Sequence, residues 1–253
     1  MLTTTPDFYS RYERHLDLPG FGVEGQKSLL SSTVLIIGAG GLGCPVAIYL
    51  AAAGVGHLII ADDDKVSLSN LQRQIAYVSS DIGQPKVNVL AARLHQQNPH
   101  VRITPHNMRL TRETIFTLEE NIDLIIDCTD SFESRYAINE AAVRFGVPFL
   151  SGSVIYQSGQ VALFAGHLPE GPCYRCLYPI APSTDIAPTC TESAVLGPVC
   201  GVIGSLMAVK AINYLAHPKI ESKYMLFMYE GNEGHTYSSH IKKSEVCPIC
   251  NVG

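Results

Sequence analysis

A run of closely spaced glycines most strongly limits what this chain can fold into. Gly38-Ala-Gly-Gly-Leu-Gly43 follows the β-branched run Thr33-Val-Leu-Ile-Ile37 and precedes the small and apolar residues 43–53. A strand that turns through glycines into a helix lets backbone N–H groups approach a phosphate at the positive end of that helix. We therefore predict a nucleotide site whose phosphate end is formed by Gly38, Gly40, Gly41 and Gly43.

One acidic residue strengthens this prediction. Asp62 ends the apolar run His57-Leu-Ile-Ile-Ala, about 20 residues after the glycines, where an acid bonds a ribose hydroxyl in dinucleotide-binding folds. A glycine-rich structural turn does not account for an acid at that spacing. The motif alone suits NAD as well as other nucleotides.

The rest of the first half alternates between strand and helix patterns. Predicted strands cover 33–38, 57–62, 101–105, 122–128 and 148–152, and predicted helices cover 43–53, 86–98, 112–121 and 134–145. Such alternation predicts an α/β fold with a Rossmann-like, doubly wound, mainly parallel sheet. We expect short helices over 8–31, a nucleotide-binding half over 32–150 and a second half over 151–253, all within one domain.

The second half has a different pattern. Strand-like segments at 160–165 and 224–229 flank one long helical segment, 197–215. We expect these strands to extend the same sheet in antiparallel fashion.

Charge and hydropathy exclude several classes of function. Lys and Arg number 18 against 23 Asp and Glu, without a basic run, so we expect neither nucleic acid nor an anionic membrane as a partner. The N-terminus lacks the features of a signal peptide, and the apolar stretches 34–43 and 196–209 look too short or too mixed to span a bilayer. We expect a cytoplasmic protein whose cysteines are thiols or metal ligands.

Several further motifs carry a resemblance to a known family. They are Asp62-Asp-Asp-Lys-Val-Ser-Leu-Ser-Asn-Leu-Gln-Arg-Gln74, Gly83-Gln-Pro-Lys86, Asp127-Cys-Thr-Asp130, Arg11-Tyr-Glu-Arg-His15, Pro172-Cys-Tyr-Arg-Cys176, Gly201-Val-Ile-Gly-Ser205 and Cys247-Pro-Ile-Cys250. Together they make the chain resemble the MoeB/ThiF family, relatives of the ubiquitin-activating enzymes, from about residue 8 onward. The resemblance implies a homodimer that transfers AMP from ATP to the C-terminal glycine of a small ubiquitin-like sulfur carrier ending in Gly-Gly, with release of pyrophosphate. Such carriers serve molybdopterin or thiamine synthesis.

The same resemblance implies roles for individual residues. Attack of a carboxylate on the α-phosphate needs cations around the triphosphate and an acid for Mg²⁺. Arg73 and Lys86 would contact the phosphates, Asp130 would serve the magnesium, and Arg14 would reach in from the other subunit. The nucleotide would also be lined by Gly41, Asp62, Asp64, Ser69, Asn70 and Ser131.

Each of these roles has a simpler alternative. Lys86 would ordinarily be a solvated helix residue, Arg73 an ion-pair partner, and Asp130 a cap for the next helix. Two positions also depart from the family pattern: Ser131 stands where related members tend to carry Asn, and Asp63 adds a third acid between Asp62 and Asp64. Neither departure removes a required group.

The cysteines suggest a metal site. Cys173-x-x-Cys176 and Cys247-x-x-Cys250 offer four thiolates, a set that suits tetrahedral, structural Zn²⁺. Two local redox dithiols, or free thiols, are the alternative. Cys44, Cys128 and Cys200 lie in apolar contexts typical of core packing.

Cys190 lies in a polar segment and differs from the other cysteines. It matches the position of the family's crossover-loop cysteine, which in thiamine-pathway members forms an acyl disulfide with the carrier. The alternative is an exposed thiol without a catalytic role.

Other functions remain open at this stage. An NAD-dependent oxidoreductase would share the glycine motif but would not need Arg73, Lys86 and Asp130 together. A non-catalytic module that docks a carrier, or a relative that adenylates a peptide or a transfer RNA, are further alternatives. We find no sulfurtransferase segment in the sequence and expect sulfur to come from a separate protein.

Overall fold

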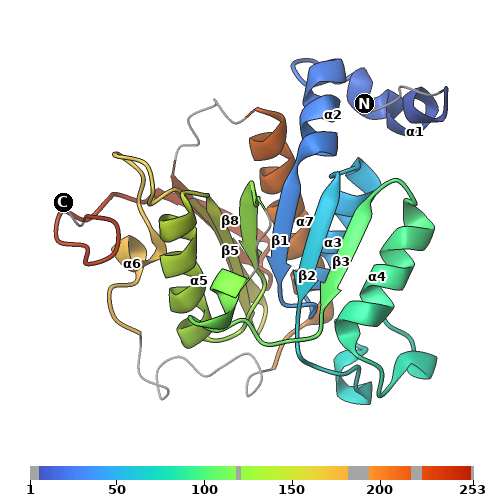
Figure 1. Cartoon of the computed structure of the whole chain (residues 1–253). Helices are drawn as coiled ribbons and strands as arrows, with labels where there is room; N and C mark the ends of the chain where they lie inside the picture. The colour runs from blue at the N-terminus through green and yellow to red at the C-terminus, as the bar shows by residue number, and fades with distance from the viewer. Residues whose placement is uncertain (1–5, 118–120, 182–193, 218–223, 252–253) are drawn as a thin grey trace.

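Eight strands form one sheet in the computed structural model, which describes residues 6–117, 121–181, 194–217 and 224–251 (Figure 1). The strand order is β3-β2-β1-β4-β5-β6-β7-β8; the pairs from β3 to β5 are parallel and those from β5 to β8 antiparallel. The prediction of a mainly parallel α/β sheet with antiparallel strands in the second half is therefore confirmed. The strands are β1 Thr33–Ile37, β2 His57–Ala61, β3 Arg102–His106, β4 Leu124–Asp127, β5 Phe149–Ile155, β6 Ser158–Phe164, β7 Met225–Glu230 and β8 His235–His240.

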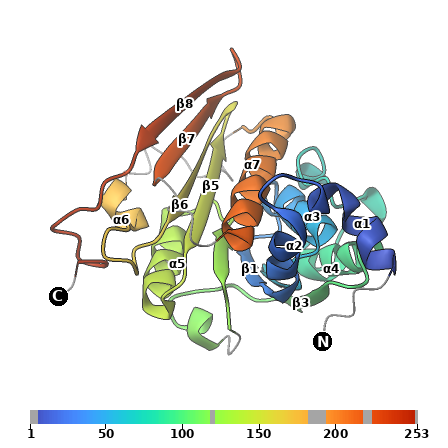
Figure 2. The same cartoon turned by 90° about the horizontal axis from the view of Figure 1, so that it is seen from above.

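Helices cover both faces of the parallel part of the sheet. Figure 2 shows α2, α3, α4 and α7 on one face and α5 and α6 on the other, while α1 lies beside α2. The α-helices are α1 Pro6–Leu16, α2 Gly22–Ser31, α3 Gly43–Ala53, α4 Lys86–Gln97, α5 Phe132–Phe145, α6 Tyr174–Leu177 and α7 Gly197–Ala216. The connections contain the 3₁₀ helices η1 Leu68–Asn70, η2 Ser79–Asp81 and η3 Thr114–Thr117.

The alternation of side chains along β1 explains why both faces are covered. Val34 and Ile36 enter the core under α3 and α7, whereas Leu35 and Ile37 enter the core under α5. Successive side chains of a strand point to opposite faces, so a continuous run of Val, Leu and Ile needs helices on both sides.

The register places the site-bearing turns side by side. Ile37 pairs with Ala61 of β2 and with Asp127 of β4, so three parallel strands end at the same level. The chain leaves β1 and β4 on opposite faces, through α3 and α5. Ligands of open α/β sheets bind in the crevice at such a switch point, beyond the carboxyl ends of the strands.

The predicted elements mostly agree with the structure, with three exceptions. The helix expected over 112–121 is wrong: residues 114–117 form only the 3₁₀ helix η3, and 118–120 lie outside the described residues. Neither β8, whose side chains are all exposed, nor the short α6 was predicted.

The apolar stretch after residue 196 also needs a correction. It continues to Ala216 as α7, which is long and apolar enough to cross a membrane by length and composition alone. Core helices meet the same criteria, and half of its most apolar window is buried, with α2, α3, β5 and β6 among its neighbours.

Candidate functional site

A cavity of about 470 Å³ lies at the carboxyl ends of β1, β2 and β4. Its size falls within the range of small-molecule sites, roughly 300–1,000 Å³. Its wall includes most of the nucleotide-site residues predicted from the sequence: Gly38, Gly40, Gly41, Asp62, Asp64, Asn70, Arg73, Lys86, Asp130 and Ser131. Gly43 and Ser69 are not among the lining residues.

The glycine motif forms the tight turn that its sequence predicts. Gly38 has φ +98°, and a Cβ there would lie 2.8 Å from the carbonyl oxygen of Cys128. A Cβ on Gly43 would collide with the carbonyl of Gly38. The glycines thus let the turn fold back on itself and pack against the turn after β4.

Asp62 holds this turn through its carboxylate. Its Oδ2 accepts a hydrogen bond from Ala39 N at 2.7 Å, and its Oδ1 accepts one from Asp64 N at 2.8 Å. Burial raises the pKa of Asp62, and the nearby Lys86 charge opposes that rise. Each carboxylate oxygen can accept a further hydrogen bond, so Asp62 can also accept one from a ribose hydroxyl.

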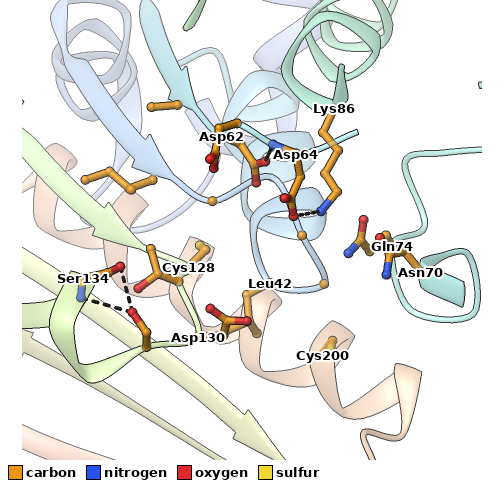
Figure 3. Close-up of a pocket in the computed structure, with 18 of the residues that line it drawn as sticks. Leu42, Asp62, Asp64, Asn70, Gln74, Lys86, Cys128, Asp130, Ser134 and Cys200 are labelled. Atoms are coloured by element: carbon orange, nitrogen blue, oxygen red, sulfur yellow. Dashed lines mark hydrogen bonds and ion pairs between the residues drawn. The ribbon is translucent and has the colours of Figure 1, made fainter. Parts of the chain in front are cut away.

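Lys86 is a buried cation in the wall of the cavity. It is 4% exposed, and its Nζ lies 2.7 Å from Oδ2 of Asp64 (Figure 3). The hydroxyl of Tyr77 donates to the carbonyl of Ala39 at 2.7 Å and lies 3.4 Å from that of Lys86, which ties the glycine turn to the start of α4. The alternative of a solvated lysine is therefore wrong.

Arg73 and Asn70 come from the connection between β2 and α4. Arg73 Nη1 donates to the carbonyl of Ser69 at 3.2 Å, and no carboxylate within the described ranges lies in ion-pair distance of its guanidinium. The alternative of a structural ion pair thus finds no support. Figure 3 shows Asn70 beside Gln74, on the side of the cavity nearest Lys86.

Asp130 presents an exposed carboxylate to the cavity. It does not cap α5: the N-cap is Ser131, whose Oγ accepts from Ser134 N at 3.2 Å. The Ser131 hydroxyl also donates to Ser134 Oγ at 2.8 Å. The capping alternative for Asp130 is therefore wrong, and its carboxylate is available to a ligand.

Arg14 lies at the opposite end of the molecule. Tyr12 of the same helix accepts a hydrogen bond from Asn98 Nδ2 at 2.9 Å and lies against Gly54, the C-cap of α3. The glycine turn is at the other end of α3, whose 11 residues span about 16 Å. Figure 1 shows α1 beyond the ends at which β1, β2 and β3 begin. Arg14 does not reach the cavity of its own chain.

The four cysteines predicted as metal ligands come together. Their sulfurs lie within 4.8 Å of one another, with 3.6 Å between Cys173 and Cys247 and 3.4 Å between Cys176 and Cys250. Four Zn–S bonds of about 2.3 Å in a tetrahedron require sulfurs about 3.8 Å apart, so this donor set fits zinc. Burial raises the pKa of the Cys247 thiol, but hydrogen bonds from the backbone N–H groups of Cys250 and Ile249 and from the Cys173 and Cys250 thiols together lower it below its usual value.

The remaining cysteines differ in their surroundings. Cys190 lies outside the described residues. Cys44 is fully buried, and burial raises its pKa to about 11. Cys128 and Cys200, predicted as core residues, are also in the wall of the cavity.

Other lining residues were missed by the sequence analysis. Gln74 stands inside a quoted motif, but nothing in the pattern separates it from its neighbours. Further missed positions follow β3, lie at the end of β5 or precede α7, where only the folded chain shows that they meet: Met108, Arg109, Leu110, Ser153, Val154 and Val195.

Comparison with known proteins identifies one matching protein family and several similar proteins. The model described as "ThiF family" matches residues 12–251. The "Sulfur carrier protein adenylyltransferase" of Thermus thermophilus is 39% identical over 249 residues, which cover 97% of this chain and 92% of that protein. The "Sulfur carrier protein ThiS adenylyltransferase" of Escherichia coli is 40% identical over 242 residues, covering 96% and 95%.

Longer relatives and solved structures are also similar. The "Adenylyltransferase and sulfurtransferase MOCS3" of Caenorhabditis briggsae is 41% identical over 241 residues, covering 95% of this chain but only 60% of that protein. The crystal structure of Escherichia coli MccB with ATP has a TM-score of 0.83 and 22% identity and covers 96% of this chain and 75% of that one. This structural likeness establishes the shared fold.

Proposed function

Because this chain belongs to the ThiF family, we propose that it is an ATP-dependent adenylyltransferase that activates the C-terminal glycine of a ubiquitin-like sulfur carrier. The observation that carries the proposal is the convergence of Lys86, Arg73 and Asp130 with the glycine turn on one cavity. The names of the relatives that match it over nearly their whole length support the same activity.

The proposed reaction joins the carrier carboxylate to the α-phosphorus of ATP. A carboxylate oxygen forms the new P–O bond, the bond to the bridging oxygen breaks, and pyrophosphate leaves with the electron pair. Little covalent chemistry falls to the protein, so catalysis rests on positioning and on neutralising charge. The buried Lys86 ammonium, the Arg73 guanidinium and the N–H groups of the glycine turn provide that positive field.

Asp130 is the residue we propose to hold Mg²⁺. Magnesium prefers oxygen ligands and is commonly bound through one or two carboxylates together with substrate phosphates. An exposed carboxylate facing the cavity, free of any capping role, fits that demand. The ion would neutralise part of the triphosphate charge.

We propose that two copies of the chain form a dimer in which each copy places its Arg14 in the cavity of the other. Arg14 lies far from the cavity of its own chain, which supports a role for it in the cavity of a partner chain. Apolar side chains exposed on η1, on the neighbouring connection and on α7 support a protein contact near the cavity: Leu68, Ile75, Val78, Val202 and Val209. Gly197 at the start of α7 lies against Gln72, so these segments adjoin.

We propose that Cys173, Cys176, Cys247 and Cys250 hold one structural Zn²⁺. All four positions of a tetrahedron would be filled by protein, which leaves no open position for a catalytic water. The ion would join α6 and the residue before it to the C-terminal end of the described chain.

Sulfur chemistry would follow adenylation. The acyl adenylate is open to attack by a thiolate or persulfide, since AMP is a good leaving group. We propose that a separate sulfurtransferase supplies the sulfur and that Cys190 serves this later step if the carrier belongs to the thiamine pathway. The molybdopterin and thiamine carriers both remain candidates.

The proposal is tested by ATP–pyrophosphate exchange. Labelled pyrophosphate should enter ATP only when a carrier with a free C-terminal Gly-Gly is present, and a carrier lacking the last glycine should give none. The oxidoreductase alternative predicts instead that NADH absorbance changes with a reducible substrate while no exchange occurs.

A further inference from the structure

A buried acid and a buried arginine flank the turn that carries Asp130. Asp127 is fully buried at the end of β4, and Arg135 on α5 is 5% exposed. Arg135 Nε lies 3.6 Å from Asp127 Oδ2. A buried pair of this kind often contributes little net stability, because both ions lose their hydration.

The contacts of this pair converge on Thr129. Asp127 Oδ1 accepts hydrogen bonds from Thr129 N at 2.9 Å and from Thr129 Oγ1 at 2.6 Å. Arg135 Nη2 donates to the carbonyl of Thr129 at 2.9 Å. Both backbone polar groups and the hydroxyl of Thr129 are therefore fixed by groups with formal charge, the strong class of hydrogen bond.

The carboxylate of Asp127 is itself held from outside the turn. Ser151 Oγ, on β5, donates to Asp127 Oδ2 at 2.7 Å. Burial raises the pKa of Asp127, and the Arg135 charge and these hydrogen bonds oppose that rise. Ser151 is not in the wall of the nucleotide cavity, whereas Thr129 is.

Asp130 thus stands between two fixed neighbours. Thr129 is held by Asp127 and Arg135, and Ser131 is held by its cap on α5. No hydrogen bond or ion pair holds the Asp130 carboxylate itself within the part of the chain that the structure describes. Because the backbone on both sides of Asp130 is fixed, only its side chain has to be ordered when a ligand binds, which lowers the cost of binding.

We infer that Asp127, Arg135 and Ser151 are positioning residues that aim the Asp130 carboxylate at the metal–nucleotide complex. This inference rests on the proposed function and deepens it, since it adds three buried residues to the magnesium end of the site. The Ser131 cap and the Asp127 network fix the turn from both sides.

Substitutions of neutral partners test the inference without breaking the ion pair. Thr129→Val keeps the side-chain shape and removes the hydroxyl that donates to Asp127. Thr129→Ser keeps the hydroxyl, and Ser151→Ala removes a donor that does not touch the cavity. Thr117→Val is the matched control, because its hydroxyl donates to the carbonyl of Thr114 on η3.

The measurement is the dissociation constant of ATP for the full chain by isothermal titration calorimetry, with Mg²⁺ and again with EDTA. We expect Thr129→Val and Ser151→Ala to weaken ATP binding about tenfold in Mg²⁺, the factor for one charge-assisted hydrogen bond. Ser151→Ala, whose side chain is outside the cavity wall, should leave binding in EDTA unchanged. Thr129→Ser should bind ATP more tightly than Thr129→Val in Mg²⁺, and Thr117→Val should match the wild type in both conditions.

Either of two results would overturn this inference while leaving the proposed function intact. One is wild-type binding by Thr129→Val and Ser151→Ala in Mg²⁺; the other is an equal loss with Mg²⁺ and with EDTA, which would mean that the network merely supports the fold. Failure of the wild-type chain to bind ATP at all would overturn the proposed function, and the inference with it.

Discussion

The burial of Lys86 decides how the cationic residues of the cavity are interpreted. An ammonium group that is 4% exposed has given up most of its hydration, and its ion-pair partner among the described residues is the largely exposed Asp64. An ammonium in such a place is strongly attracted to an incoming phosphate, because little water competes for it. Arg73 donates to a backbone carbonyl and has no ion-pair partner among the described residues, so it is similarly available to anions.

We predict that Lys86→Ala and Arg73→Ala each reduce adenylate formation by about 100-fold or more, the effect of losing one donor that stabilises a transition state. The measurement is the ATP–pyrophosphate exchange rate at saturating carrier. Lys27→Ala is the control: this exposed lysine pairs with Glu24 on α2, and its loss should leave the rate unchanged. Near-normal rates in both cavity variants would refute the assignment of the phosphate site.

At the scale of elements, the cysteine cluster joins parts of the chain that are distant in sequence. Cys173 precedes α6 and Cys247 follows β8, yet their sulfurs are 3.6 Å apart. We predict one Zn²⁺ per chain, and a loss of about 3 kcal/mol or more in the free energy of unfolding for Cys247→Ser, which lowers Tm by roughly 6–12 °C.

Metal analysis measures the zinc content of the protein, and differential scanning calorimetry measures the Tm of Cys247→Ser. Val246→Ala is the matched control, because Val246 neighbours a ligand but is 88% exposed and should not alter Tm. Protein purified without chelator that contains no zinc would contradict the prediction.

The elements also show what the sequence can and cannot reveal. β1 and α3 were predictable because a β-branched run, closely spaced glycines and a run of small residues are strong local signals. The helix expected over 112–121 failed because its pattern is equally compatible with the short turn that brings Leu110 and Ile115 into the core under α5. β8 carries no apolar alternation, since all its side chains are exposed, and only pairing with β7 defines it.

The residues of the site likewise include some that the sequence predicts and others that it does not. Asp62, Lys86 and Asp130 belong to motifs with recognisable spacing. The roles of Ser151 and Arg135 depend on contacts between β4, β5 and α5 that no local pattern encodes.

At the scale of the whole molecule, Arg14 and the cavity lie at opposite ends of α3. If a partner supplies Arg14, then Arg14→Ala and Asp130→Ala subunits, each inactive alone, should regain activity when mixed. Half of the dimers would be mixed and would carry one intact site, so we predict about a quarter of the wild-type rate per protomer. Subunit exchange is verified by native mass spectrometry. No recovery after verified exchange would place Arg14 outside the partner's site.

The central claim concerns AMP transfer to a protein carboxylate. The most direct measurement is intact mass spectrometry of a ubiquitin-like sulfur carrier ending in Gly-Gly, incubated with the chain, ATP and Mg²⁺. We predict a carrier heavier by one AMP moiety, attached at the C-terminal glycine and absent when Lys86 is replaced by Ala. An unmodified carrier in the presence of folded, ATP-bound protein would contradict it.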